Sequence, residues 1–149
     1  MQTIREILDK KGSEVYSVTP DSTVFEALTL MADKNIGAVL VLEGDKLVGI
    51  MSERDYARKI ALKGKFSKEV PVKEIMSAKV ICVGPDQTID NTKAIMISKR
   101  IRHLPVLEED KLIGLISIGD VVNALLDENL FVIDQLETYI KGVQAPKKE

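Results

Sequence analysis

The chain contains one segment twice. The residues from Val15 to Asp55 reappear without a gap as Val80 to Asp120, at a constant offset of 65 positions. A duplicated unit predicts two similar folds packed about a pseudo-two-fold axis, so a site built by one copy has a counterpart in the other. The closest matches are Val41-Leu42-Glu43 with Val106-Leu107-Glu108, Asp45-Lys46-Leu47 with Asp110-Lys111-Leu112, Gly49 with Gly114, Ser52 with Ser117 and Asp55 with Asp120.

The composition argues against several classes of protein. A net charge of −2 and 4% aromatic residues give little of the basic and stacking surface that nucleic-acid binding needs. No apolar run approaches the ~20 residues that span a bilayer, and the first residues lack the basic and then apolar order of a signal peptide. The single Cys82 excludes an intrachain disulfide and a multi-cysteine metal site. We therefore predict a cytoplasmic protein with no membrane segment and no metal.

Each copy predicts the same order of elements: strand, helix, strand, strand, helix. Asp21 and Ser22 are capping candidates for the first helix, which has apolar residues at helical spacing behind them. Gly44-Asp45 and Glu109-Asp110 predict turns that close antiparallel hairpins. The predicted elements are Val15–Val18, Val24–Lys34, Ala38–Leu42, Leu47–Ser52 and Asp55–Lys63 in the first copy, and Val80–Val83, Ile89–Arg100, Leu104–Leu107, Leu112–Ser117 and Gly119–Leu126 in the second.

Three segments lie outside the copies. Thr3–Lys10 and Val72–Met76 are predicted short helices, each leading into and packing with the copy that follows it. Phe131–Lys141 is a predicted helix whose apolar stripe packs on this protein or on a second copy of it, and Val143–Glu149 is a predicted disordered tail. The predicted divisions are 1–64 for the first repeat with its lead-in helix, 65–78 for the linker and second lead-in, 79–128 for the second repeat, and 129–149 for the C-terminal helix and tail.

The third predicted strand of each copy runs into a helix through a hydroxyl followed, three residues later, by a carboxylate. These residues are Ser52 and Asp55 in the first copy and Ser117 and Asp120 in the second. One interpretation is helix capping, in which the hydroxyl accepts from free backbone N–H groups and the acid complements the positive end of the helix dipole. The other is a nucleotide site, because the same N–H groups suit a phosphate and a carboxylate accepts ribose hydroxyls. The repetition strengthens the second interpretation, and both stay open.

A cationic segment marks the entry to one strand of the second copy. Arg100 and Arg102 precede Leu104-Pro105-Val106, and an arginine suits phosphate because it is a permanently charged fork of donors. The alternative is a solvated helix end, where basic residues also favour the dipole. The single His103 has no neighbouring group that would form a nucleophile or metal set with it. A phosphate clamp is predicted in the second half, because the aligned residues of the first copy are uncharged: Asn35, Gly37 and Ala38.

The repeat resembles a pair of CBS domains, the module named after cystathionine β-synthase. Within that family the chain is similar to small stand-alone two-repeat proteins of bacteria and archaea. The resemblance implies an α/β module in which two three-stranded sheets pack together and leave two clefts. It covers most of the chain and rests on Val18-Thr19-Pro20-Asp21-Ser22-Thr23, Val83-Gly84-Pro85-Asp86-Gln87-Thr88, Arg102-His103-Leu104-Pro105-Val106 and the two Gly-x-x-Ser-x-x-Asp endings.

The resemblance also implies a ligand. Such modules bind AMP, ADP or ATP, and in some cases S-adenosylmethionine or NADH. It implies that Asp120 holds the ribose hydroxyls, that Ser117 and the backbone at Gly119 meet the phosphate, and that Arg102 or His103 reaches the same phosphate. Adenine is expected against Val80, Ile81 and Pro105. The matching set in the first half is Ser52, Arg54 and Asp55, in a cleft that lacks the cation pair and the proline.

The sequence thus predicts a homodimeric regulatory module that senses energy or redox state through an adenine nucleotide and signals to an unidentified protein. One alternative is a dimerisation module with empty clefts. A second is a nucleotide-processing enzyme, but no Walker loop, dinucleotide fingerprint or set of acid, base and nucleophile is present.

Overall fold

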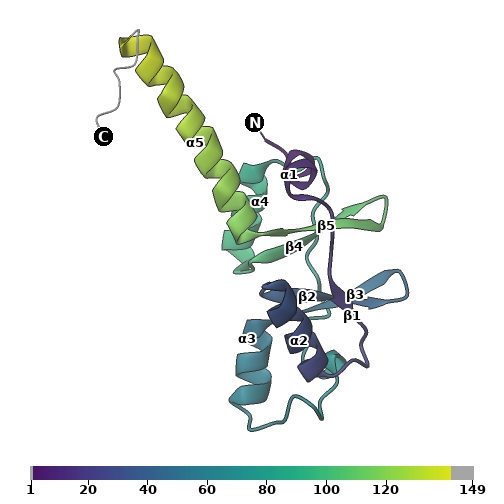
Figure 1. Ribbon diagram of the computed structural model, residues 1–149. Helices are drawn as coiled ribbons and strands as arrows, with labels where there is room; N and C mark the ends of the chain where they lie inside the picture. The colour runs from purple at the N-terminus through teal and green to yellow at the C-terminus, as the bar shows by residue number, and fades with distance from the viewer. Residues whose placement is uncertain (1, 142–149) are drawn as a thin grey trace.

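The computed structural model describes the backbone of residues 2–141 and the side chains of residues 2–138, so the predicted tail lies outside the described residues. The predicted α/β class with two repeated units is confirmed (Figure 1). A π-helical turn, Ala57–Ala61, directly follows the helix Glu53–Tyr56, and a 3₁₀ turn, Val72–Glu74, lies in the linker. The other elements are α1 (Ile4–Lys11), β1 (Ser17–Val18), α2 (Val24–Lys34), β2 (Ala38–Glu43), β3 (Lys46–Ser52), α3 (Glu53–Tyr56), α4 (Ile89–Lys99), β4 (His103–Glu108), β5 (Lys111–Ser117) and α5 (Ile118–Lys141).

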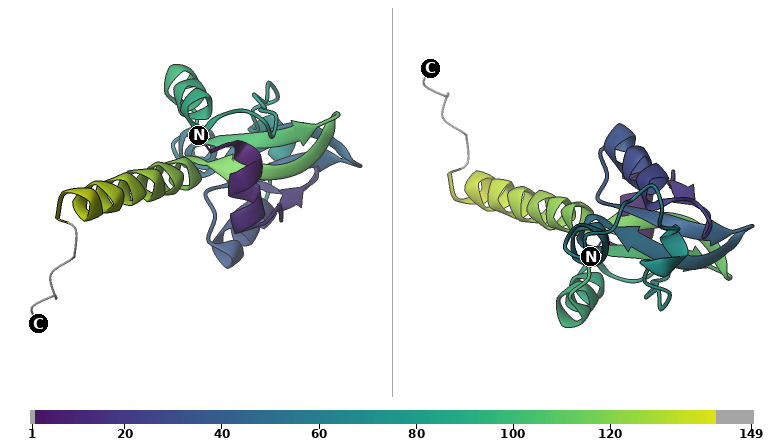
Figure 2. Two further views of the ribbon diagram at one scale, coloured as in Figure 1. Left: turned by 90° about the horizontal axis from the view of Figure 1, so that it is seen from above. Right: turned by 90° about the horizontal axis from the view of Figure 1, so that it is seen from below.

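The two repeats form two small sheets. The first sheet has the order β1-β2-β3, with β1 parallel to β2 and β2 antiparallel to β3, and the second sheet is the antiparallel β4-β5 hairpin. Both hairpins carry a register shift at the same aligned position, after Val41 and after Val106. The hairpins lie side by side in Figures 1 and 2, and Leu40, on the face of β2 opposite Val39 and Val41, is fully buried.

The expected third strand of the second sheet, Val80–Val83, is reduced to one parallel bridge between Val83 and Val106. The cause is a proline. In the first repeat the N–H of Leu40 donates to the Tyr16 carbonyl at 3.2 Å. Pro105 stands at the aligned position of the second repeat and has no N–H to donate.

The C-terminal part also differs from the prediction. The two expected helices, Gly119–Leu126 and Phe131–Lys141, are a single helix of 24 residues, α5. The intervening Asp127-Glu128-Asn129-Leu130 contains neither proline nor glycine, so nothing in it stops the helix. Beyond the second repeat α5 extends away from the rest of the molecule (Figures 1 and 2).

Each repeat has its own core, and the core is completed by the segment that precedes the other repeat. Ile4, Ile7 and Leu8 of α1 are buried in the second-repeat core with β4, β5 and α5. The corresponding linker residues are buried or partly buried in the first-repeat core: Val72, Ile75 and Met76. The expectation that each copy packs with its own lead-in is therefore wrong, because the two segments are exchanged.

The exchanged segments bind their repeats in the same way. Ile4 N–H donates to the Gln87 carbonyl at 2.9 Å, and Val72 N–H donates to the Ser22 carbonyl at 2.7 Å. The matched glycines make room for them, since a Cβ on Gly114 would lie 2.6 Å from Leu8 Cδ2, and one on Gly49 would overlap Met76. The equivalent positions of the two segments are 68 residues apart, from Ile4 to Val72, rather than 65.

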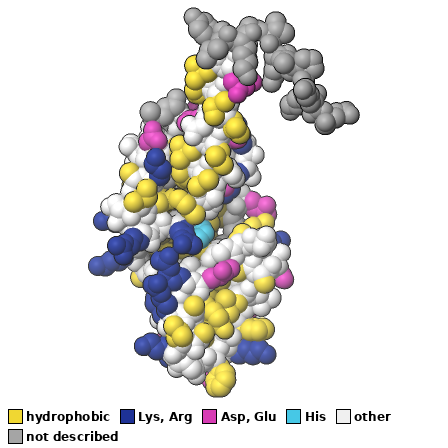
Figure 3. All heavy atoms as spheres, turned by 90° about the vertical axis from the view of Figure 1, so that its left-hand side faces the viewer, with side chains coloured by type: hydrophobic (Ala, Val, Ile, Leu, Met, Phe, Trp, Pro, Cys, Tyr) yellow, Lys and Arg dark blue, Asp and Glu magenta, His cyan; other side chains and the backbone are white. Residues whose placement is uncertain are grey.

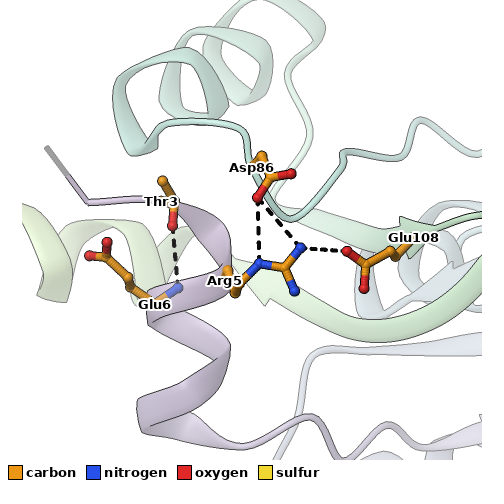
Figure 4. A network of polar contacts seen from close by, with 5 residues as sticks. All are labelled: Thr3, Arg5, Glu6, Asp86 and Glu108. Atoms are coloured by element: carbon orange, nitrogen blue, oxygen red, sulfur yellow. Dashed lines mark hydrogen bonds and ion pairs between the residues drawn. The ribbon is translucent and has the colours of Figure 1, made fainter.

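An ion-pair network repeats the arrangement on the surface. Figure 4 shows Arg5 of α1, whose Nε and Nη2 donate to Asp86 Oδ1 at 3.4 Å and whose Nη2 also donates to Glu108. In the first repeat, Lys73 Nζ donates to Asp21 Oδ1 at 2.9 Å. These groups are exposed, so they align the segments more than they stabilise them.

The exchanged packing predicts which repeat is destabilised by a substitution in α1. Replacing the fully buried Ile4 by Ala should lower the free energy of unfolding by about 2 to 5 kcal/mol, because it leaves a cavity in the second-repeat core. Hydrogen exchange measured by mass spectrometry should show larger loss of protection in β4 and β5 than in β2. Glu6→Ala, at an exposed position of the same helix, is the control. Greater loss in β2 would contradict the exchange.

Candidate functional site

A cavity of about 360 Å³ lies where the end of β3 meets the start of β4, a volume within the usual range for small-molecule sites. It draws on both repeats and on the end of the linker. Its lining residues are Gly37, Ile50, Ser52, Glu53, Arg54, Asp55, Ser77, Arg100, Ile101, Arg102 and His103.

The register of the hairpins explains why these residues meet. Ala38 pairs with Ser52 in the first sheet and His103 pairs with Ser117 in the second, so each hairpin has a strand start and a strand end at the same edge. The two edges adjoin, because a Cβ built on Gly37 would lie 3.8 Å from His103 Cε1. The small residue before β2 therefore lets the histidine before Leu104 approach the first repeat.

Ser52 and Asp55 form a reciprocal cap at the start of α3. Ser52 Oγ accepts from Asp55 N–H at 3.3 Å, and Asp55 Oδ2 accepts from Ser52 N–H at 2.9 Å. Lys59 Nζ lies 3.3 Å from Asp55 Oδ1, one helical turn on. The capping interpretation is thus confirmed, and the cap also holds the carboxylate at the cavity wall.

Three arginines line the cavity together with this cap. Arg100 follows α4 with a left-handed backbone (φ 55°), which ends the helix and turns the chain toward β4. Arg100, Arg102 and Arg54 give the lining three permanent positive charges against Glu53 and Asp55, of which Asp55 is already paired with Lys59. In Figure 3 the single histidine, in cyan, lies beside a group of Lys and Arg side chains. The cavity is therefore net positive and suits an anion.

The His103 ring is only partly exposed, and burial is the main cause that lowers its pKa from the ordinary value of 6.5. The positive charges of Arg102 and Lys11 lower this pKa further, while Asp120 and Glu53 act in the opposite direction. His103 is accordingly neutral at pH 7, when one ring nitrogen can donate and the other can accept a hydrogen bond.

Asp120, the acid of the second Ser and Asp pair, lines a different, smaller hollow of about 240 Å³. Ser117 N–H donates to Asp120 Oδ2 at 2.8 Å, and Asp120 N–H donates to Ser117 Oγ at 3.2 Å. Lys11 Nζ, from the exchanged helix α1, donates to the same carboxylate at 2.7 Å and to the Leu115 carbonyl at 2.9 Å. A lysine of the chain itself thus neutralises Asp120.

The structure divides the residues predicted for the site differently from the sequence-based grouping. Arg102 and His103 line the cavity with Ser52, Arg54 and Asp55, whereas Asp120 lines the smaller hollow. The sequence grouped Arg102 with Asp120 because it treated each repeat as a closed unit. Which aspartate shares a ligand with Arg102 stays a prediction, since the charge of Asp120 also acts on His103. The remaining predicted residues line neither space: Val80, Ile81, Pro105, Ser117 and Gly119.

Several lining residues were missed by sequence reasoning. Gly37 was considered only as a place where charge is lacking, although its small size admits His103. Ser77 was assigned to the linker, but it pairs with Ile50 and so lies at the cavity edge. Glu53 stands between Ser52 and Arg54 in the sequence and carried no signal of its own.

Membrane-spanning helices and metal sites are both absent from the described residues 2–141. No helix there is both long and apolar enough to cross a membrane. That same part of the chain has no cluster of three His, Cys, Asp or Glu side chains placed to hold a metal ion.

Comparisons with family models, curated proteins and solved structures all point to the same family. The family model described as CBS domain matches residues 4–62 and 72–127. The chain is 38% identical over 149 residues to the mitochondrial CBS domain-containing protein CBSX3 of Arabidopsis thaliana, covering 94% of this chain and 72% of the relative. A Burkholderia ambifaria protein with CBS domains has a similar structure, with a TM-score of 0.83 and 50% identity over 85% of this chain and 95% of that chain.

A more distant structural neighbour carries ligands. The CBS domain pair of protein MJ0100, solved in complex with 5-methylthioadenosine and S-adenosyl-L-methionine, has a TM-score of 0.76 at 22% identity. The match covers 86% of this chain and 98% of that chain. At this level of identity the similarity establishes the common fold alone.

The single histidine allows a direct test of the cavity's electrostatics. The His103 Cε1 proton should titrate by NMR with a midpoint below 6.5, since burial and Arg102 disfavour the charged ring. Because the unfolded chain takes up this proton first, the stability of the fold should decrease as pH falls below 6.5 and should recover above it. His103→Gln should remove that part of the pH dependence. A midpoint above 6.5 would contradict the buried placement.

Proposed function

The chain belongs to the CBS domain family, and we propose that it is a regulatory module that binds an adenine nucleotide in the cavity between its two repeats. The observation that carries the proposal is the convergence of three arginines, a neutral histidine and a capped serine and aspartate on one cavity of about 360 Å³. Neither repeat supplies this set alone.

The proposed roles follow from the chemistry of each group. Arg102 and Arg100 pair with the phosphate, and neutral His103 donates a hydrogen bond to it. Asp55 accepts from the ribose hydroxyls, while Ser52 and the start of α3 lie beside the phosphate. The apolar Ile50 and Ile101 form the part of the lining suited to adenine. The earlier candidates Val80, Ile81 and Pro105 remain a second proposed surface for the base.

The net positive lining favours a phosphate-bearing ligand. AMP, ADP and ATP carry negative charge at the position of the arginines, and NADH carries a pyrophosphate. S-adenosylmethionine has a positive sulfonium instead, which the three arginines would repel. The ligands of MJ0100 support an adenosyl ligand in a related fold, and the charge of this cavity supports the phosphorylated members of that class.

We propose that binding regulates rather than catalyses. A ligand that contacts Arg102 on one repeat and Asp55 on the other favours the arrangement in which these two residues are close. The shift in free energy equals the difference in ligand-binding free energy between the arrangements. That shift would carry an energy or redox signal to a protein partner within a cytoplasmic homodimer. Ser52 and His103 both line the cavity, but the Ser52 hydroxyl donates to Asp55 Oδ2 at 3.2 Å rather than to the histidine, an arrangement that supports binding more than turnover.

The first test removes the phosphate contact. By isothermal calorimetry of the full chain against AMP, ATP, NADH and S-adenosylmethionine, we expect saturable binding of a phosphorylated ligand. Arg102→Ala should weaken that binding by roughly 10-fold to 100-fold, the usual effect of losing a hydrogen bond to a charged group. Arg58→Ala removes the same charge from an exposed position outside the lining and should have little effect.

The results would also separate the rival functions. No binding of any of the four ligands by the wild-type chain would favour the dimerisation module with empty clefts. Conversion of ATP or NADH to products during the incubation would favour the enzyme. Equal weakening by Arg102→Ala and Arg58→Ala would show that the effect is one of overall charge, and would remove the cavity from the proposal.

A second test asks which acid holds the ribose. Asp55→Asn should weaken nucleotide binding by roughly 10-fold, because the amide replaces a charged acceptor with a neutral one. Asp120→Asn should change the affinity less, since Lys11 already occupies that carboxylate. Circular dichroism of both variants controls for loss of the helix caps. A larger loss of affinity in Asp120→Asn would move the nucleotide to the smaller hollow.

A further inference from the structure

A short segment of the first repeat concentrates positive charge. Residues 56–68 contain no Asp or Glu, although the whole chain has a net charge of −2. Lys59 pairs with Asp55, whereas the other basic residues of the segment form no ion pair within the described residues. The aligned residues of the second repeat, 121–133, lie within α5 and contain no Lys or Arg. The charge therefore belongs to the first repeat alone, and its residues are Arg58, Lys59, Lys63, Lys65 and Lys68.

The same segment exposes large apolar side chains. Leu62 and Phe66 are 80% and 70% exposed, more than any other large hydrophobic residue in the described part of the chain. Phe25, at the start of α2, is 43% exposed, and Lys68 Nζ lies 4.7 Å from the centroid of its ring. In Figure 3 hydrophobic side chains at the lower end of the molecule are flanked by Lys and Arg side chains. We call residues 62–68 the basic turn.

The backbone fixes the basic turn in an outward position. Gly64 has a left-handed backbone (φ 68°), and the N–H of Lys65 donates to the Ile60 carbonyl at 3.0 Å, so the chain reverses directly after the π-helical turn. Phe25 N–H donates to the Ser67 carbonyl at 3.0 Å and ties the turn to α2. Ile60 is buried in the first-repeat core, but every residue from 61 to 66 is exposed. The apolar side chains of the turn are thus held in water by an ordered backbone.

The shape and chemistry of the basic turn favour a lipid surface as its partner. Residues of the turn line neither the cavity nor the smaller hollow, and the turn lies at the end of the molecule opposite the projecting part of α5 (Figure 1). A protein partner would need a pocket that matches the projecting side chains. A bilayer needs no matching shape, because its interface admits apolar side chains while anionic headgroups attract lysines. Nucleic acid fits less well, since Leu62 cannot stack on a base.

We propose that the basic turn docks the protein on an anionic lipid bilayer, with Leu62 and Phe66 inserted among the headgroups and the lysines of the turn against the lipid phosphates. A lysine can lay its apolar stem beside the inserted residues while its charged end reaches a headgroup. Two apolar side chains and three lysines give a reversible contact that salt weakens, rather than a permanent anchor. The contact does not depend on nucleotide binding.

Sedimentation of the full chain with vesicles tests the contact. We expect binding to vesicles of phosphatidylcholine with phosphatidylserine, little binding to phosphatidylcholine alone, and release in about 1 M salt, where the Debye length is about 3 Å. Replacing Lys63 and Lys65 together by Gln should weaken binding roughly 30-fold, or about 5-fold for each charge. Replacing Lys46 and Lys111 by Gln removes the same charge beside the hairpin turns, at exposed positions, and should have little effect.

Fluorescence tests the insertion. The chain has no tryptophan, so Phe66→Trp provides a single emission that should shift to shorter wavelength when anionic vesicles are added. Ile97→Trp places the same probe on α4 of the second repeat, at a position that is 67% exposed, and its emission should not shift. Leu62→Ser combined with Phe66→Ser should lower vesicle affinity by roughly 10-fold or more, because the apolar contribution is lost. Circular dichroism checks that each variant stays folded.

Several results would overturn the proposal. Failure of the wild-type chain to bind anionic vesicles is one, and an unshifted Phe66→Trp emission on bound vesicles is another. Equal weakening by the two pairs of lysine substitutions would reduce the contact to overall charge. Tighter binding of single-stranded polyuridylate than of the vesicles, with quenching of Phe66→Trp, would assign the basic turn to nucleic acid instead.

Discussion

The structure depends on the exchange of the two lead-in segments. The apolar side chains of α1 fill the second-repeat core, and those of Val72–Met76 fill the first-repeat core, so each repeat is completed by a segment that covalently precedes the other. Since neither core is whole without the other half of the chain, the two repeats cannot separate while both remain folded. A cavity lined by both repeats is consequently fixed by the same packing that folds the protein.

The two repeats share their backbone geometry but differ in their charged side chains. Both hairpins share their register shift, their room-making glycine and their serine and aspartate cap. Arg100 and Arg102, however, stand before the second hairpin and have no charged counterpart before the first. Because the hairpin edges adjoin, they face the cap of the first repeat, while the cap of the second repeat meets Lys11. The two repeats therefore form one net positive cavity and one hollow in which Lys11 pairs with the acid. Only the cavity is suited to a phosphate.

The sequence predicted the elements well and their partners less well. The bounds of α2 were predicted to the residue and both hairpins to within one or two residues, because helical spacing, caps and turns are local signals. The partner of α1 is a long-range choice, made by the space beside Gly114 rather than by α1 itself. The loss of the strand at Val80–Val83 was readable in principle, because Pro105 occupies a position where the first repeat uses an N–H. Five of the eleven cavity-lining residues were among the predicted site residues, and the division of the predicted residues between two spaces required knowing which hairpin edges adjoin.

The cavity and the projecting helix are connected through one strand end. Arg102 lines the cavity, and its carbonyl accepts from the N–H of Ile118, the first residue of α5, at 2.8 Å. A ligand that draws Arg102 toward Asp55 therefore acts on the first residue of α5. The coupling free energy between the cavity and α5 cannot exceed the difference in ligand-binding free energy between two arrangements of β4 and α5. The coupling must also be reciprocal. Any contact that restrains α5 would in turn restrict the positions open to Arg102, so that such a contact and the occupancy of the cavity would influence one another through the same short segment.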